Sequence, residues 1–75
     1  VMIAVDPARQ SAVERKLATI PAVTSLYTVS GSYDLIAVLA AESTESLDAS
    51  LDAVRETPGV KSTVTSVVLS QRFAR

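Results

Sequence analysis

The sequence contains no cysteine and no histidine among its 75 residues. Without cysteine there can be no disulfide and no thiolate metal ligand. Without histidine the chain lacks the commonest transition-metal ligand and the usual base of a nucleophilic triad. Carboxylates are the remaining potential ligands, and the eight acidic residues are too scattered to indicate a metal site. We therefore expect neither a metal nor a cofactor.

Glycines and aromatic residues are also scarce. Two glycines cannot supply a phosphate-binding loop, and one Phe with two Tyr cannot form a base-stacking platform. The formal charge of −1 excludes a phosphate-tracking basic surface, so direct nucleic-acid binding by this chain is not expected. No apolar run reaches the roughly 18 residues of a membrane span, and Val1–Val5 is too short for a signal peptide. The expectation is a cytoplasmic protein with no membrane partner.

A chain of this length is expected to form one domain, near the lower limit for a stable single core. Small domains usually add disulfides, a metal or oligomerisation to that core. Because the composition removes the first two, self-association remains. A hydrophobic content of 48% is high for so short a chain and points the same way.

The first third of the chain reads as a strand followed by a helix. The apolar run Val1–Val5 predicts the strand, and Asp6 and Pro7 suit the N-cap and first position of a helix. Pro21 disfavours helical geometry in the residue before it, which ends the helix near Ile20. Apolar residues recur at helical spacing between these limits, namely Val13, Leu17 and Ile20.

Two further strands and a hairpin are expected next. Val23–Ser30 is rich in Val, Thr and Tyr, and Leu35–Ala41 is almost wholly apolar. The intervening Gly31-Ser32 predicts a tight two-residue turn.

The last part of the chain predicts a second helix and a final strand. Ser43 or Thr44 begins the helix, and Pro58-Gly59 closes it. Val60–Leu69 then reads as a strand, followed by a polar tail over residues 71–75. The apolar stripe of the second helix consists of Leu47, Leu51 and Val54.

A faint internal repeat suggests the topology. Each predicted helix ends in proline, a small residue and valine, as Pro21-Ala22-Val23 and Pro58-Gly59-Val60. Two βαβ units joined by a hairpin form the ferredoxin-like βαββαβ pattern of the α+β class. Right-handed crossovers place the first and third strands in the centre of a four-stranded antiparallel sheet, with both helices on one face.

The two strands predicted to be central are apolar at consecutive positions. In Val1–Val5 and Leu35–Ala41 both faces are therefore apolar, whereas the uncovered face of such a sheet is normally polar. An exposed patch of that size is unusual in a monomer, so we expect the sheet to pack against a second copy. The alternative is that an upstream segment of the same chain covers it.

The sequence does not support a catalytic reaction. Asp48 and Asp52 lie four residues apart on the second predicted helix, where a solvated helix face explains them more simply than a catalytic pair. Lys16 and Lys61 do not lie in apolar runs that would lower an amine pKa. We therefore expect that the chain is not an enzyme.

Three segments resemble a known family. Ser30–Leu35, read Ser-Gly-Ser-Tyr-Asp-Leu, resembles the Gly-x-(Tyr/Phe)-Asp-Leu hairpin of the Lrp/AsnC effector-binding domain, also called the RAM domain. Thr57–Thr65 resembles the family's Pro-Gly-Val-x-x-Thr-x-Thr stretch, and Val67–Leu69 resembles the apolar end that follows. With the βαββαβ order, the resemblance covers nearly the whole chain, which we treat as one domain, residues 1–75.

The resemblance implies a homodimer formed through the sheets, and stacking of dimers into a ring such as an octamer or decamer. It also implies that amino acids or related metabolites bind at the interfaces between dimers. The family's transcription regulators carry an N-terminal helix-turn-helix, which this sequence lacks. The chain is thus expected to be a stand-alone member or the effector half of a regulator, with a full-length regulator as a further possible partner.

The resemblance also implies the ligand-binding residues. An Asp34 carboxylate can pair with an α-ammonium, while threonine hydroxyls and backbone N–H groups near Gly31 can receive an α-carboxylate. Simpler roles stay open: Asp34 as a turn residue, Gly31 as the turn glycine, threonines as strand formers, and Tyr33 as an interface residue. The full candidate set is Gly31, Ser32, Tyr33, Asp34, Thr63, Thr65 and Ser66.

Three functions compete at this point. The first is a small-molecule-sensing, oligomerising domain of the Lrp/AsnC type, with an amino acid as effector. The second is a structural module that co-assembles with a full-length regulator and senses nothing. The third is an enzyme on a dimeric α+β barrel, which the absence of histidine disfavours.

Overall fold

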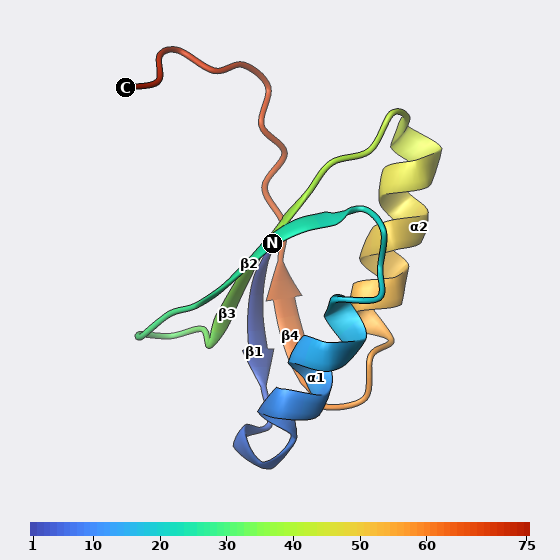
Figure 1. Ribbon diagram of the computed structural model, residues 1–75, viewed down its shortest axis with the longest axis vertical. Helices are drawn as coiled ribbons and strands as arrows, with labels where there is room; N and C mark the ends of the chain where they lie inside the picture. Colours follow the sequence, from blue (N-terminus) through green and yellow to red (C-terminus); the bar gives the residue numbers. More distant parts are fainter.

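The computed structural model describes residues 1–75 as one antiparallel sheet with two α-helices packed on it (Figure 1). The strand order is β2-β3-β1-β4, so the first and third strands are central, as the sequence predicts. The ferredoxin-like α+β fold is confirmed. The elements are β1 (Met2–Val5), the 3-10 helix η1 (Pro7–Arg9), α1 (Gln10–Leu17), β2 (Val23–Thr28), β3 (Leu35–Leu39), α2 (Thr44–Arg55) and β4 (Val60–Val64).

Both helical segments begin at the predicted caps. The Asp6 side chain accepts a hydrogen bond from the Ala8 N–H at 3.1 Å, and Pro7 occupies the first helical position. The Ser43 hydroxyl accepts from the Ser46 N–H, also at 3.1 Å. These bonds satisfy backbone donors that have no partner within a helix, which is why such residues favour helix starts.

The first helix ends earlier than expected. Regular α-helix stops at Leu17, and the Thr19 and Ile20 N–H groups donate to carbonyls only three residues back. Pro21 explains this tighter last turn. It excludes helical geometry in the residue before it, so the helix must end early. The predicted apolar stripe is nonetheless confirmed, since Val13, Leu17 and Ile20 are all buried.

The predicted two-residue hairpin turn is wrong. The Val29 N–H donates to the Asp34 carbonyl at 3.0 Å, which leaves four residues, 30–33, in the loop. The Asp34 N–H donates across to the Ile3 carbonyl at 2.9 Å, so Asp34 already belongs to the pairing with β1. Gly31 lies in this loop with φ +124°, a conformation that side-chain-bearing residues rarely adopt.

The last strand is also shorter than predicted. β4 pairs with β1 from Val5 opposite Val60 to Met2 opposite Val64, and it carries a bulge at Lys61. Residues 65–75 have no regular structure, although residues 65–69 have a strand composition.

Helices α1 and α2 cover the same face of the sheet (Figure 1). The core lies between them and the sheet, and β1 and β3 contribute alternate residues to it. No helix is both long and apolar enough to cross a membrane. The core cluster consists of Ile3, Val5, Val13, Leu17, Ile20, Leu35, Ala37 and Val54.

The opposite face of the sheet, which we call the bare face, carries an apolar row across all four strands. The strand register aligns Tyr27 with Ile36, Ile36 with Met2, and Met2 with Val64. Val38 follows on β3, and 45% of its surface is exposed. The expectation that the central strands are apolar on both faces is confirmed, and no helix covers this face.

Gly59 connects the end of α2 to β4 in a space that admits no side chain. Its φ is +102°, and its carbonyl accepts a hydrogen bond from the Asp6 N–H at 2.8 Å. A Cβ atom at this position would lie 2.8 Å from Arg9 Cβ and 2.9 Å from Val13 Cγ2. A Cβ atom at Gly31 would meet nothing within 4 Å.

The two glycines form a matched pair for substitution. Gly31→Ala should cost only the backbone strain, about 1–2 kcal/mol of unfolding free energy. Gly59→Ala adds a steric clash with the core and should cost about 3 kcal/mol or more. Urea unfolding monitored by circular dichroism measures both, and equal losses in the two variants would contradict the packing described at Gly59.

Candidate functional site

The predicted ligand-binding residues fall into two groups, and the first is the β2–β3 loop. Gly31 and Ser32 are exposed at its tip, whereas Tyr33 and Asp34 are half-buried where it joins β3. The positive φ of Gly31 turns the backbone sharply there. The tip is thus a solvent-exposed loop that presents backbone N–H groups and one hydroxyl.

The Asp34 side chain is held by a hydrogen bond from β1, and not by one from its own turn. Its Oδ2 atom accepts a hydrogen bond from the Val5 N–H at 2.9 Å, while its backbone N–H donates to Ile3. The carboxylate therefore continues the β1–β3 hydrogen-bond ladder beyond its last backbone pair, Ile3 opposite Leu35. The other carboxylate oxygen, Oδ1, has no hydrogen-bond partner within the chain. Sequence reasoning considered a turn role and a ligand role, and missed this link between strands.

The second group, Thr63, Thr65 and Ser66, lies at the end of β4. Thr63 faces Ile3 across the β1–β4 pair, and Thr65 and Ser66 follow the last paired residue, Val64. Thr63 and Thr65 are half-buried, and Ser66 is exposed. Their hydroxyls form no hydrogen bond within the chain, so all three can bind a further group.

One protomer does not bring the two groups together. Ile3 pairs with Leu35 on one side and with Thr63 on the other, so these residues are two strand spacings apart, roughly 10 Å. From the level of Ile3, the β2–β3 loop extends toward one end of the sheet, whereas Thr65 and Ser66 lie toward the other end. A ligand of amino-acid size cannot contact both groups within a single chain.

A groove that the sequence analysis did not predict lies at the end of the sheet where β3 and β4 finish. It has a volume of about 600 Å³ and is lined mainly by apolar residues from β3, α2 and the segment after β4. Leu47 and Leu51 of α2 form one wall, and Thr65 and Ser66 form part of another. The signal in the sequence was the start of the apolar α2 stripe, Leu47, together with the small residues Ala40 and Ala41.

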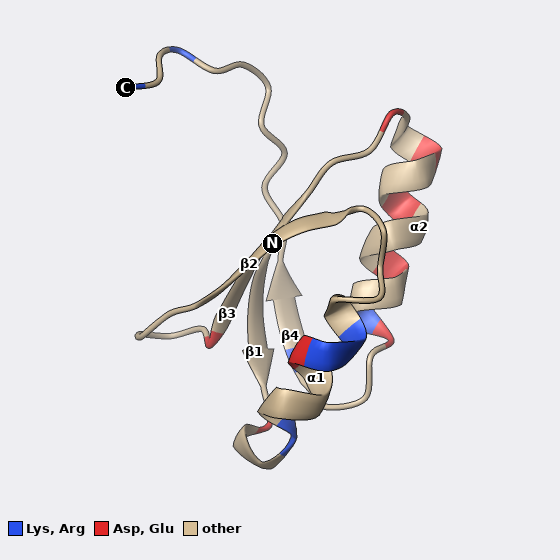
Figure 2. Ribbon diagram, in the orientation of Figure 1, with Lys and Arg blue, Asp and Glu red and all other residues tan.

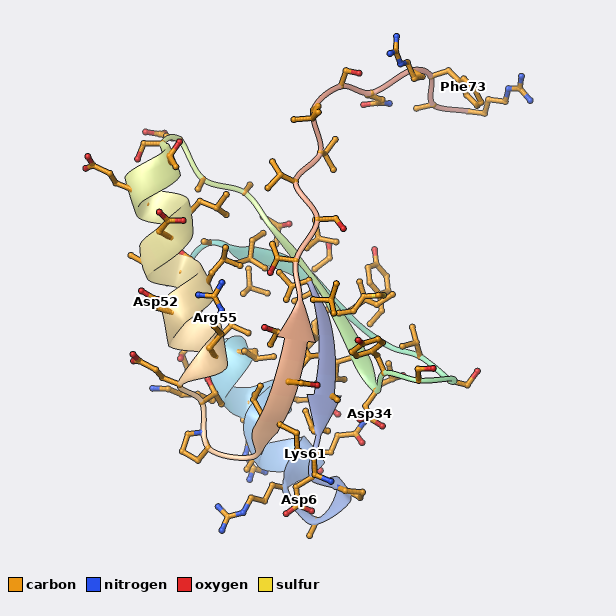
Figure 3. All side chains as sticks on the ribbon, turned by 180° about the vertical axis from the view of Figure 1, so that it is seen from behind. Asp6, Asp34, Asp52, Arg55, Lys61 and Phe73 are labelled. Atoms are coloured by element: carbon orange, nitrogen blue, oxygen red, sulfur yellow. The ribbon has the colours of Figure 1, made fainter.

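Most charged side chains lie on the helices and the loops that flank them, with others at the β2–β3 hairpin and in the C-terminal segment, and the strands are almost free of them (Figure 2). The only ion pair joins Arg55 to Asp52 at 2.8 Å, on the exposed side of α2. Lys61, at the bulge of β4, is the one charged residue within a strand (Figure 3). No three potential metal ligands gather anywhere in the chain. The geometry thus offers hydroxyls, one carboxylate and apolar surface for ligand recognition.

The structure is that of a small ferredoxin-like domain with a carboxylate-anchored loop and free hydroxyls at the end of its last strand. The sequence matches the family described as Lrp/AsnC ligand binding domain over residues 1–75, the whole chain. The chain belongs to this family, as the hairpin and last-strand motifs predicted.

Similar proteins include a solved structure and several enzymes. The crystal structure of TTHA0845 from Thermus thermophilus superposes with a TM-score of 0.84 at 28% identity, covering 99% of this chain and 92% of that one. Homocitrate synthases of Sulfurisphaera tokodaii and Saccharolobus islandicus are 36% and 34% identical over 61 residues. The match covers 81% of this chain but only 13% of each enzyme.

Replacing Asp34 tests its role between the strands. Asp34→Ala leaves the Val5 N–H without a partner and should lower the unfolding free energy by about 1.5–3 kcal/mol. Asp34→Asn keeps an oxygen acceptor and should cost less than about 1 kcal/mol. As a control, Asp52→Ala removes only an exposed ion pair, worth roughly 0.5 kcal/mol. If Asp34→Ala lowered the free energy of unfolding in urea by no more than Asp52→Ala does, the proposed anchoring would be contradicted.

Proposed function

We propose that this chain is the effector-binding and oligomerisation domain of an Lrp/AsnC-type transcription regulator, or a stand-alone regulatory protein of that type. Family membership across residues 1–75 is the observation that carries the proposal. The effector is an amino acid or a closely related metabolite, and the chain itself is not catalytic. Such a domain acts in the cytoplasm, with a full-length regulator as a possible partner.

The chemistry of the candidate residues suits an amino acid. The Val5 N–H orients the Asp34 carboxylate through Oδ2, which leaves Oδ1 available to an α-ammonium group. Backbone N–H groups near Gly31, together with the hydroxyls of Thr63 and Thr65, provide donors for an α-carboxylate. Ser32, Tyr33 and Ser66 complete the proposed site. Because one protomer keeps the two groups apart, the proposal locates the binding site between protomers.

The bare face supports a homodimer formed through the sheets. Met2, Tyr27 and Val38 are each between 38% and 55% exposed, and the row of residues to which they belong contains no charge. Burying them against a second copy removes this surface from water and compensates for the small core of the protomer. In the proposal, dimers then stack into a larger ring such as an octamer or decamer.

A thermal-shift screen with the common amino acids tests the function. An effector at about 100 times its dissociation constant adds roughly 2.7 kcal/mol of stability, which should raise Tm by about 10 °C or more in a domain of this size. Asp34→Asn and Thr65→Val should reduce the shift without preventing folding. If no amino acid changed Tm, the proposed effector class would be wrong.

Substitution on the bare face tests the dimer. Val38→Lys would bury a charge between the sheets, and it should raise the dissociation constant of the dimer on the order of 100-fold. Ala49→Lys adds the same charge on an exposed position of α2 and serves as the matched control. Sedimentation velocity across a concentration series measures both, and equal behaviour of the two variants would count against sheet-mediated pairing.

A second candidate function is an allosteric module of an enzyme. The observation that favours it is the 34–36% identity to a short segment of homocitrate synthases. In that case the domain would sense a metabolite for an attached or associated catalytic chain rather than for a DNA-binding one. Titration of this chain against a full-length Lrp/AsnC regulator and against a homocitrate synthase, with and without amino acids, separates these partners from a purely structural module.

A further inference from the structure

The groove beside α2 lies in line with β1. Val1 lines it at the point where β1 begins, between β3 and the segment that follows β4 (Figure 1). Residues 38–41 form one wall beyond Val1, and residues 65–68 form the other. Because β1 separates β3 from β4, these walls are two strand spacings apart, roughly 10 Å, which leaves room for one strand between them.

The hydrogen-bond ladder between β1 and β3 is interrupted at Val1. The Val1 ammonium donates to the Ala37 carbonyl at 2.8 Å, and the Ala37 N–H donates to the Val1 carbonyl at 2.9 Å. Successive residues of a strand direct their backbone groups to opposite sides, and the Ala40 N–H donates to the Ala22 carbonyl on the β2 side. Leu39 therefore directs its N–H and C=O into the groove, where no strand faces them.

The same alternation applies to the segment after β4. Met2 lies opposite Val64 in the β1–β4 pair. Since Val1 directs its backbone groups to β3, Met2 directs its own to β4. Continuing this register by two residues makes Ser66 the next residue whose backbone faces the groove. Unpaired backbone groups thus face each other across the width of one strand.

We propose that the groove receives an extended strand joined to Val1, which continues β1 for four residues between its two walls. This strand runs in the direction of β1 and is antiparallel to both neighbours, as the sheet is throughout. The first residue before Val1 bonds to Ser66 and the second bonds to Leu39. The next two repeat the pattern with Val68 and Ala41, so the four residues span roughly 13 Å.

The faces of β1 determine the side chains that this strand needs. Val1 packs against the core, whereas Met2 lies on the bare face. Because side chains alternate, the second residue before Val1 lies on the helix side, which Leu47 and Leu51 of α2 line. Glu42 is the one charged side chain that lines the groove. The groove therefore fits an uncharged strand with an apolar residue at this second position.

A strand joined to Val1 is favoured over one from a separate molecule. Val1 is already in register with β3, so a residue attached to it enters the groove at a high effective concentration. A separate peptide of four residues would gain too little contact to offset its loss of translational and rotational freedom.

Extended chains test the proposal by thermal unfolding. One variant carries Thr-Ser-Ile-Thr before Val1, and its matched control carries Thr-Ser-Asp-Thr, so the two differ only at the second position before Val1. Burial of the isoleucine should place the Tm of the first variant about 10 °C above that of the control. A difference of less than about 2 °C would overturn the proposal.

Amide hydrogen exchange, measured by NMR on the isoleucine variant and on the unextended chain, locates the strand. The Leu39 and Ser66 amides should exchange at least about tenfold more slowly in the extended chain. Val67 directs its N–H away from the groove, so its exchange should not change. Unchanged exchange at Leu39 and Ser66, or protection of Val67 in place of Ser66, would mean that the added residues lie elsewhere and would overturn the proposal.

Replacing Leu47 tests the contact with α2. Leu47→Ala removes part of the wall that the isoleucine covers, so it should abolish at least about half of the Tm difference between the two extended variants. Glu45→Ala, at an exposed position of the same helix, should leave that difference unchanged. If both substitutions had the same effect, the second residue would not lie against α2.

The strand would also link an attached domain to the candidate effector site, a link that rests on the function proposed above. Ser66 would pair with the strand through its backbone and offer its hydroxyl to the effector. Slower exchange at Leu39 and Ser66 with no amino-acid-induced rise in Tm would support the strand and reject the effector. A rise in Tm with amino acids, without slower exchange at these amides, would support the effector and reject the strand.

Discussion

Two helices can cover only one face of a four-stranded sheet, and in this domain both faces of the central strands are apolar. The covered face forms the core around Ile3, Leu17 and Leu35, all fully buried. The bare face carries the row Tyr27, Ile36, Met2 and Val64 with no layer over it. In a chain without cysteine or potential metal sites, burial of that face is the largest stabilising contribution still available.

The same constraint explains why the candidate site looks incomplete. The loop at Gly31 and the hydroxyls of Thr65 and Ser66 lie toward opposite ends of one sheet, with β1 and β3 between them. Asp34 is held in place by the Val5 N–H, so the carboxylate is preorganised before any ligand arrives. In the proposed function the effector binds between subunits, so assembly and ligand recognition are two aspects of one event, and the effector alters a regulator through its quaternary structure.

Much of the fold could be predicted from the sequence because local chemistry determines it. Asp6, Pro7 and Ser43 specify helix starts, alternating and helical periodicities separate strands from helices, and the repeated Pro-small-Val pattern reveals the topology. The errors arose where a distant segment decides the outcome. The hairpin is wider than expected because Asp34 bonds to β1, which is distant in the sequence. The groove beside Leu47 was missed for the same reason, since three separate segments form it.

The central claim is that the bare face is covered in solution. Methyl NMR with a soluble paramagnetic agent tests it most directly, with Met2, Ile36 and Val38 as reporters and the exposed Ala49 of α2 as reference. The account predicts that the three reporter methyls relax far more slowly than Ala49 at micromolar and higher concentrations, and lose this protection on dilution. Relaxation as fast as that of Ala49 at all concentrations would mean that the face is open to water, and would contradict the account.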